Sequence, residues 1–162
     1  IDRAPMWFTE GMAACIGNAE VRNKKLYMCA RNGVIAQESL PLIQHWIREG
    51  KHVPLKKLLT LPEEYFQGPD GGELYAQSWS FCHFLLTYPD HEDPKNQIPN
   101  GKYWTVLSNL IQLASRKAMK HEELMTAVFQ LKGKALDLDE LEKEWKDYIL
   151  KMQNDATQEQ ND

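Results

Sequence analysis

The chain has 162 residues, of which 43% are hydrophobic and 26% charged, and its formal net charge at pH 7 is −4. This composition predicts one domain of ordinary size with an apolar core. The acidic balance provides no basic patch for nucleic acid, and no apolar run approaches the roughly 20 residues that a membrane span requires. Composition therefore argues against a nucleic-acid-binding function and against a membrane span.

The first predicted helix covers residues 6–16, "MWFTEGMAACI". Pro5 suits its start, because a residue in the first helical turn needs no N–H for a helical hydrogen bond. Gly17 and Asn18 are typical of a helix end. Residues 25–30, "KLYMCA", then have the composition of a short strand, so we expect at most one short strand or hairpin in the chain.

Apolar residues at helical spacing predict that the rest of the chain is mainly helical. Residues 73–88 form the most hydrophobic stretch, so we predict a central, largely buried helix there. Asp137 or Asp139 can cap the last helix. The other helical stretches are residues 39–50, two short turns opened by Pro54 and Pro62, residues 102–119, residues 121–131 and residues 140–152.

The three cysteines, at positions 15, 29 and 82, form no CxxC pair. Their odd number and wide spacing indicate neither a disulfide framework nor a cysteine zinc site. We favour the interpretation that all three are small buried hydrophobic residues. One disulfide with a spare thiol is the alternative, so the sequence leaves the redox compartment open.

Glu10 and Gly11 are unusual neighbours inside an otherwise apolar helix. One interpretation makes Glu10 a solvent-facing residue near the helix start, where the helix dipole favours a carboxylate, and Gly11 a close-packing position. The other interpretation gives Glu10 a chemical function. Spacing alone favours the first.

The pattern W-x-x-E-G-x-A, formed by Trp7, Glu10, Gly11 and Ala13, resembles the third-ligand helix of gluzincin metallopeptidases, and of bacterial peptidase-MA-like domains in particular. In that family an HExxH helix supplies two zinc-binding histidines and a general-base glutamate. The resemblance implies that Glu10 is the third zinc ligand. Three protein ligands leave one position for water, whose pKa the zinc lowers to about 7.

Tyr75 supports the same resemblance. In the aminopeptidase-like branch a tyrosine in a Y-x-x-G context donates a hydrogen bond to the developing oxyanion, and here Tyr75 precedes Ser78 at the head of the central helix. The resemblance therefore implies that Tyr75 is a catalytic hydrogen-bond donor. A tyrosine in the core or at its rim is the alternative.

The chain departs from the family because it contains no HExxH. Of its five histidines, only His121, in "HEELM", begins such a pattern, and Met125 replaces the second histidine. Glu10 alone cannot hold zinc, so no zinc is expected in this chain by itself. Either the HExxH helix precedes Ile1, which we favour, or the protein has lost the metal site and kept the scaffold.

Together these observations predict a mainly α single domain that resembles the carboxy-terminal helical lobe of gluzincin peptidases. We expect this lobe over residues 1–152 and a polar, disordered tail over residues 153–162. The expected function is that of the carboxy-terminal part of a zinc-dependent peptidase, with a peptide or protein substrate and zinc in the complete protein. The alternative is a non-catalytic helical module that binds a peptide or protein. The resemblance also suggests export, to the periplasm or outside the cell, whereas the residues themselves fix neither the compartment nor the oligomeric state.

Overall fold

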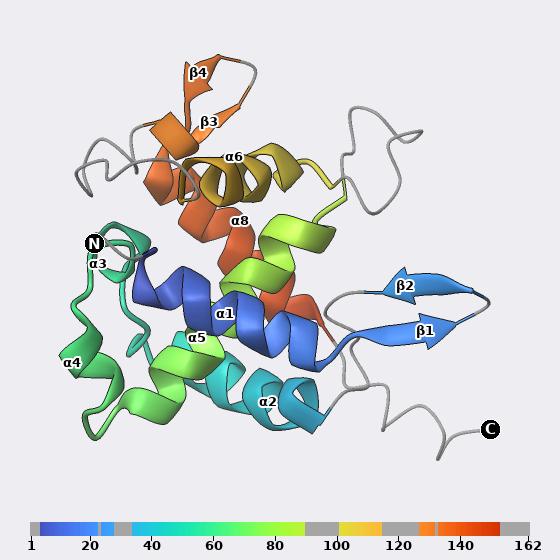
Figure 1. Cartoon of the computed structure of the whole chain (residues 1–162). Helices are drawn as coiled ribbons and strands as arrows, with labels where there is room; N and C mark the ends of the chain where they lie inside the picture. Colours follow the sequence, from blue (N-terminus) through green and yellow to red (C-terminus); the bar gives the residue numbers. More distant parts are fainter. Residues whose placement is uncertain are drawn as a thin grey trace.

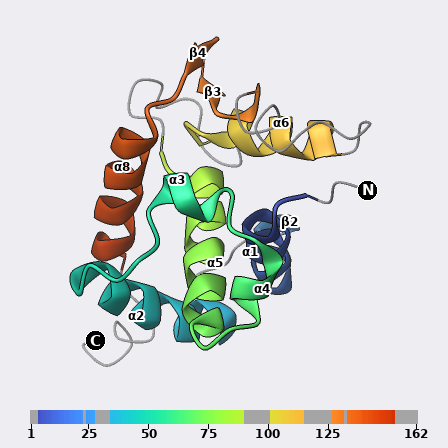
Figure 2. The same ribbon diagram turned by 90° about the vertical axis from the view of Figure 1, so that its left-hand side faces the viewer.

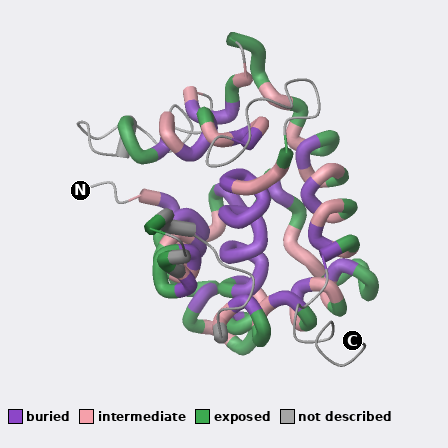
Figure 3. Tube along the Cα trace, turned by 90° about the vertical axis from the view of Figure 1, so that its right-hand side faces the viewer, coloured by how far each residue is buried: buried purple, intermediate pink, exposed green. Residues whose placement is uncertain are grey.

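A long buried helix, α5 (Gly71–Thr87), is the centre of the fold, and the other elements pack around it (Figures 1 and 2). In a computed structural model of the chain, residues 4–22, 24–27, 34–89, 101–114, 127–131 and 133–152 are described. Every residue of α5 from 76 to 86 is buried, which confirms the predicted central helix. A helix that is apolar on all sides is stable in water only when other elements cover all of it, and Figure 3 shows this burial along the central helix.

Four helices cover α5 on different sides. They are α1 (Met6–Gly17), α2 (Val34–Arg48), α6 (Trp104–Ala114) and α8 (Leu138–Lys151). Their buried apolar residues join those of α5 in one continuous core, with Trp7, Trp79 and Trp145 among its largest side chains. The protein is therefore mainly helical, as the sequence predicts.

Two short helices follow α2: α3 (Leu55–Leu58) packs against α8, and α4 (Glu63–Phe66) packs against α5. Pro54 and Pro62 are their N-cap residues, which confirms the two predicted proline-opened turns. Asp137 caps α8, because its side chain accepts hydrogen bonds from the backbone N–H groups of Asp139 and Glu140. Of the two N-cap residues that the sequence allowed, Asp137 and Asp139, the structure therefore shows Asp137.

Helix α2 begins earlier than the sequence indicates, at Val34, and contains Pro41 in its interior. A proline there removes one helical hydrogen bond. Ala36, Leu40 and Ile43 are buried on both sides of Pro41, and their packing outweighs that loss.

A predicted hairpin and a second pair of strands complete the described elements. Strands β1 (Glu20–Arg22) and β2 (Lys25–Tyr27) pair antiparallel. Strand β2 lies within residues 25–30, where the sequence suggested a strand, whereas β1 precedes them. Strands β3 (Gln130–Leu131) and β4 (Lys134–Ala135) form the second pair, in addition to the one hairpin expected. Of the helix predicted over 121–131, residues 121–126 lie outside the described residues, and the prediction is wrong at its end, residues 130–131. Gly133, at φ +76°, makes the tight turn that lets these residues pair as strands.

The polar tail predicted over residues 153–162 lies outside the described residues. None of the helices in the described ranges has both the length and the apolar character that crossing a membrane demands.

Candidate functional site

The crossing of α1 and α5 is a tight helix contact near the predicted site residues. A Cβ added to Gly11 would lie 2.4 Å from the carbonyl oxygen of Ser78 and 2.6 Å from Sγ of Cys82. Only glycine allows the two backbones to come so close. Gly11 is therefore the close-packing position that the sequence suggested, and it fixes where α1 meets α5.

Glu10 lies directly beside this crossing. It is half-buried, on the flank of α1 rather than on the face that carries the buried Trp7 and Gly11. Within the described ranges its carboxylate has no hydrogen-bond or ion-pair partner. Because Glu10 is neither committed to the core nor fully exposed, its carboxylate is available for a ligand.

Tyr75 lies on the other helix of the same crossing. It precedes Ser78 and Cys82 by three and seven residues, a spacing that places all three on one face of α5. The Tyr75 side chain is 40% exposed, and its ring packs edge-to-face on Phe66 of α4, with centroids 5.7 Å apart. In the part of the chain that the structure describes, its hydroxyl has no hydrogen-bond partner.

The structure thus brings Glu10 and Tyr75 to the same helix crossing but does not join them by a hydrogen bond. Each residue lies within one helical turn, about 5.4 Å along the axis, of the residues that form the crossing. We name this region the crossing corner and define it by Glu10, Gly11, Tyr75 and Ser78.

The described residues do not form a metal site on their own. No group of three or more His, Cys, Asp or Glu residues among them could hold a metal ion. His83 is a core residue, stacked on Trp79 with centroids 5.6 Å apart. His52 lies beside Glu142, with Nε2 3.0 Å from Oε1. His91 and His121 lie outside the described residues.

The cysteines differ from the favoured interpretation. Cys15 is disulfide-bonded, whereas Cys82 is a free thiol buried under α1. Burial raises the pKa of the Cys82 thiol well above its ordinary value of 9.0. Cys29 lies outside the described residues. The alternative of one disulfide with a spare thiol is therefore correct, and the view that all three cysteines act as small hydrophobic residues is wrong for Cys15.

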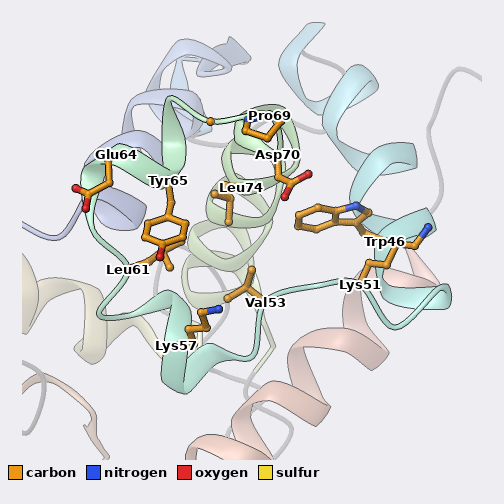
Figure 4. A pocket seen from close by; sticks show the side chains of 11 residues that line it. Trp46, Lys51, Val53, Lys57, Leu61, Glu64, Tyr65, Pro69, Asp70 and Leu74 are labelled. Carbon is orange, nitrogen blue, oxygen red and sulfur yellow. The ribbon is translucent and has the colours of Figure 1, made fainter.

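A pocket of about 700 Å³, which the sequence did not reveal, lies over the first turns of α5 (Figure 4). Trp46 of α2 and Tyr65 of α4 face each other across it, and Leu74 of α5 and Val53 form its floor. All of its lining residues lie between positions 46 and 74, but they form a pocket only because the chain folds back over the start of α5, which residue spacing does not predict. In the sequence, the only sign of this pocket is that two large aromatic residues, Trp46 and Tyr65, lie in segments with both apolar and polar residues.

Comparison of the chain with protein-family models, with curated proteins and with solved structures finds no match. The functional inference therefore depends on the residues and their geometry.

Proposed function

We propose that this chain is the carboxy-terminal, helical part of a zinc-dependent metallopeptidase domain of the gluzincin kind. In this proposal Glu10 is one metal ligand and Tyr75 donates a hydrogen bond to the oxyanion that develops on the substrate carbonyl. The substrate is a peptide or protein.

The observation that carries the proposal is the position of both residues at the crossing corner. Gly11 holds the two helices in close contact, which explains why a glycine follows the glutamate. Neither the Glu10 carboxylate nor the Tyr75 hydroxyl has a polar partner among the described residues. In this proposal the rigid helix contact positions the two polar groups, and a metal or substrate supplies the polar partners that they lack.

Helical geometry supports the proposal that the side chains of Glu10 and Tyr75 lie on the same side of the α1–α5 crossing. In Figure 1, α1 lies in front of α5 and runs from left to right, and the amino-terminal half of α5 lies below α1. A right-handed helix turns by about 100° per residue. Because Gly11 faces α5, this turn places the preceding residue, Glu10, on a flank of α1 beside α5, and the proposal assigns this flank to the side of the α5 turn that carries Tyr75.

Glu10 by itself does not fit a zinc ion, because a catalytic zinc needs three protein ligands. In this proposal the other two come from an HExxH helix that precedes Ile1 in the complete protein. The zinc would supply an activated water there. This chain's own contribution is the Glu10 carboxylate, the Tyr75 hydroxyl and the rigid crossing that positions them.

The disulfide at Cys15 supports the proposed export of the protein. Disulfides persist in oxidising compartments such as the periplasm and the extracellular space. A peptidase of this kind is therefore proposed to act outside the cytoplasm.

The test is the zinc content of the complete protein, measured by elemental analysis after dialysis. Glu10→Gln is expected to lower zinc affinity at least about tenfold, since a ligand carboxylate is lost. Glu38→Gln is the matched control, because Glu38 is exposed on α2, and it should keep the zinc. Equal zinc content in both variants would remove Glu10 as a ligand.

Tyr75→Phe separates the catalytic role from metal binding. Removal of one oxyanion donor lowers kcat about 10²- to 10³-fold, and zinc content should stay unchanged. Hydrolysis of casein by the complete protein measures this effect. If casein is cleaved equally fast by Tyr75→Phe and wild type, Tyr75 has no catalytic role. If the complete protein has no HExxH, the alternative of a non-catalytic peptide- or protein-binding module replaces the peptidase.

A further inference from the structure

The pocket over the first turns of α5 lies apart from the crossing corner. Tyr65 and Phe66 are consecutive in α4, and their side chains lie on different sides of this helix. Tyr65 lines the pocket, whereas Phe66 is buried against Tyr75. Helix α4 therefore separates the pocket from the proposed catalytic residues.

The interior of the pocket is apolar and has two aromatic walls. Trp46 and Tyr65 stand on opposite sides, with Leu61 next to Tyr65 (Figure 4). Tyr65 is 53% exposed although it has a large apolar ring. Pockets of this size and lining bind apolar groups, and aromatic walls favour a flat or bulky side chain between them.

The charges around the pocket are segregated by sign. Glu64 and Asp70 lie on the edge formed by α4 and the start of α5, whereas Lys51 and Lys57 lie on the edge formed by the end of α2 and α3 (Figure 4). In the described part of the chain, the side chains of Glu64, Asp70 and Lys57 have no hydrogen-bond or ion-pair partner. Lys51 makes one contact, 4.0 Å long, with the exposed Glu49. The pocket therefore has an acidic edge and a basic edge with free charges.

The floor of the pocket is held rigidly. Gln77 of α5 is fully buried, its Nε2 donates to the carbonyl oxygen of Val53 over 2.6 Å, and its Oε1 accepts from the N–H of Val53 over 3.0 Å. This double hydrogen bond fixes the segment that carries Val53 and Lys51 on α5. A preformed pocket loses little conformational entropy when a ligand binds.

We propose that this pocket binds a short peptide segment in which a bulky apolar residue and one further apolar residue lie between a basic and an acidic residue. The bulky apolar side chain fills the space between Trp46 and Tyr65. The basic residue faces Glu64 and Asp70, and the acidic residue faces Lys57. This proposal does not depend on zinc or on the peptidase proposal.

Four end-blocked, fluorescently labelled peptides test the charge pattern by anisotropy titration, with EDTA present so that metal plays no part. The peptide Lys-Phe-Leu-Glu is expected to bind at least about threefold tighter than Lys-Phe-Leu-Lys and Glu-Phe-Leu-Glu, a difference typical of exposed ion pairs. Lys-Ser-Ser-Glu, which lacks the apolar residues, should not bind measurably. Equal binding of the three Phe-Leu peptides, or binding of none, would contradict the proposal.

Two variants locate the binding in the pocket. Tyr65→Ala should weaken binding of Lys-Phe-Leu-Glu about tenfold or more, as for an aromatic anchor. Ile111→Ala, at an exposed residue of α6, is the matched control and should bind normally. Lys57→Glu should shift the preference to Lys-Phe-Leu-Lys without any change in the apolar lining. Circular dichroism confirms that each variant is folded, and unchanged binding by both pocket variants would overturn the proposal.

Discussion

Two regions on opposite flanks of α5 use polar groups in different ways. At the crossing corner the polar side chains Glu10 and Tyr75 are free of polar partners in the described structure, and the close approach of the two helices at Gly11 holds the corner together. Around Glu142 of α8 the polar groups are instead joined in a network. We infer that polar residues with many partners, such as Glu142, stabilise the fold, whereas polar residues without partners, such as Glu10 and Tyr75, are available for function.

The network around Glu142 joins α8 to the segment before α3. Oε2 of Glu142 accepts a hydrogen bond from the N–H of Leu55 over 2.7 Å, and Oε1 lies 3.0 Å from Nε2 of His52 and 3.3 Å from Nζ of Lys146. Nearby, Gln44 of α2 donates to the carbonyl oxygens of Ile149 and Met152 at the end of α8. These bonds satisfy buried or half-buried groups, so their loss should cost stability.

The largest expected effect is at Gly11. Gly11→Val places branched carbon atoms where Ser78 O and Cys82 Sγ already lie, so we expect a loss of about 3 kcal/mol in the free energy of unfolding. Urea titration followed by circular dichroism measures it. Gly72→Ala is the control, because a Cβ at Gly72 meets nothing within 4 Å, and it should not destabilise the protein. A stable Gly11→Val variant would show that the crossing is looser than described.

Glu142→Gln should have a smaller effect, about 1–2 kcal/mol at pH 7. Burial tends to raise the pKa of Glu142, but hydrogen bonds from the Leu55 N–H, His52 and Lys146 outweigh burial and lower this pKa below its ordinary value of 4.5. A carboxylate with a lowered pKa in the folded state stabilises the protein above the unfolded-state pKa and loses that effect as the pH falls. The difference between wild type and variant should therefore be full above about pH 5 and shrink below the ordinary pKa.

Urea titrations between pH 7 and pH 3 measure this dependence. Glu140→Gln is the control on the same helix, since Glu140 is exposed and its side chain has no partner within the described ranges; it should change stability little at any pH. A difference between Glu142→Gln and wild type that stays constant down to pH 3 would show that the charge of Glu142 contributes nothing.

The smallest effects are expected at Glu10 and Tyr75, the two residues of the crossing corner whose side chains have no described polar partner. Glu10→Gln and Tyr75→Phe should each change the free energy of unfolding by less than about 0.5 kcal/mol, because no described polar partner is lost. The same urea titration measures both variants. Destabilisation by more than about 1 kcal/mol would assign these residues to the fold and weaken the case for a functional site.

The sequence predicts well where local signals act alone. The proline-opened helices α3 and α4, the Asp137 cap and the buried α5 follow from capping and hydrophobic periodicity. Local signals fail where distant segments decide the outcome. Residues 130–131 follow a helical pattern but pair across Gly133 as a strand, and Pro41 is tolerated inside α2 because its neighbours are buried.

The candidate sites show the same limit. The pattern around Glu10 could be found in the sequence because a short motif carries it, and Gly11 could be interpreted as a close-packing residue. The contact of Gly11 with Ser78, the disulfide state of Cys15 and the pocket between Trp46 and Tyr65 depend on the fold. None of them follows from residue spacing.

The central claim is that Glu10 is a metal ligand in the complete protein, and anomalous X-ray diffraction at the zinc edge from its crystals tests it most directly. The account predicts one anomalous peak about 2.0–2.2 Å from a carboxylate oxygen of Glu10, the distance of a zinc–carboxylate bond. A zinc peak coordinated without Glu10, or no peak in crystals grown with zinc, would contradict it.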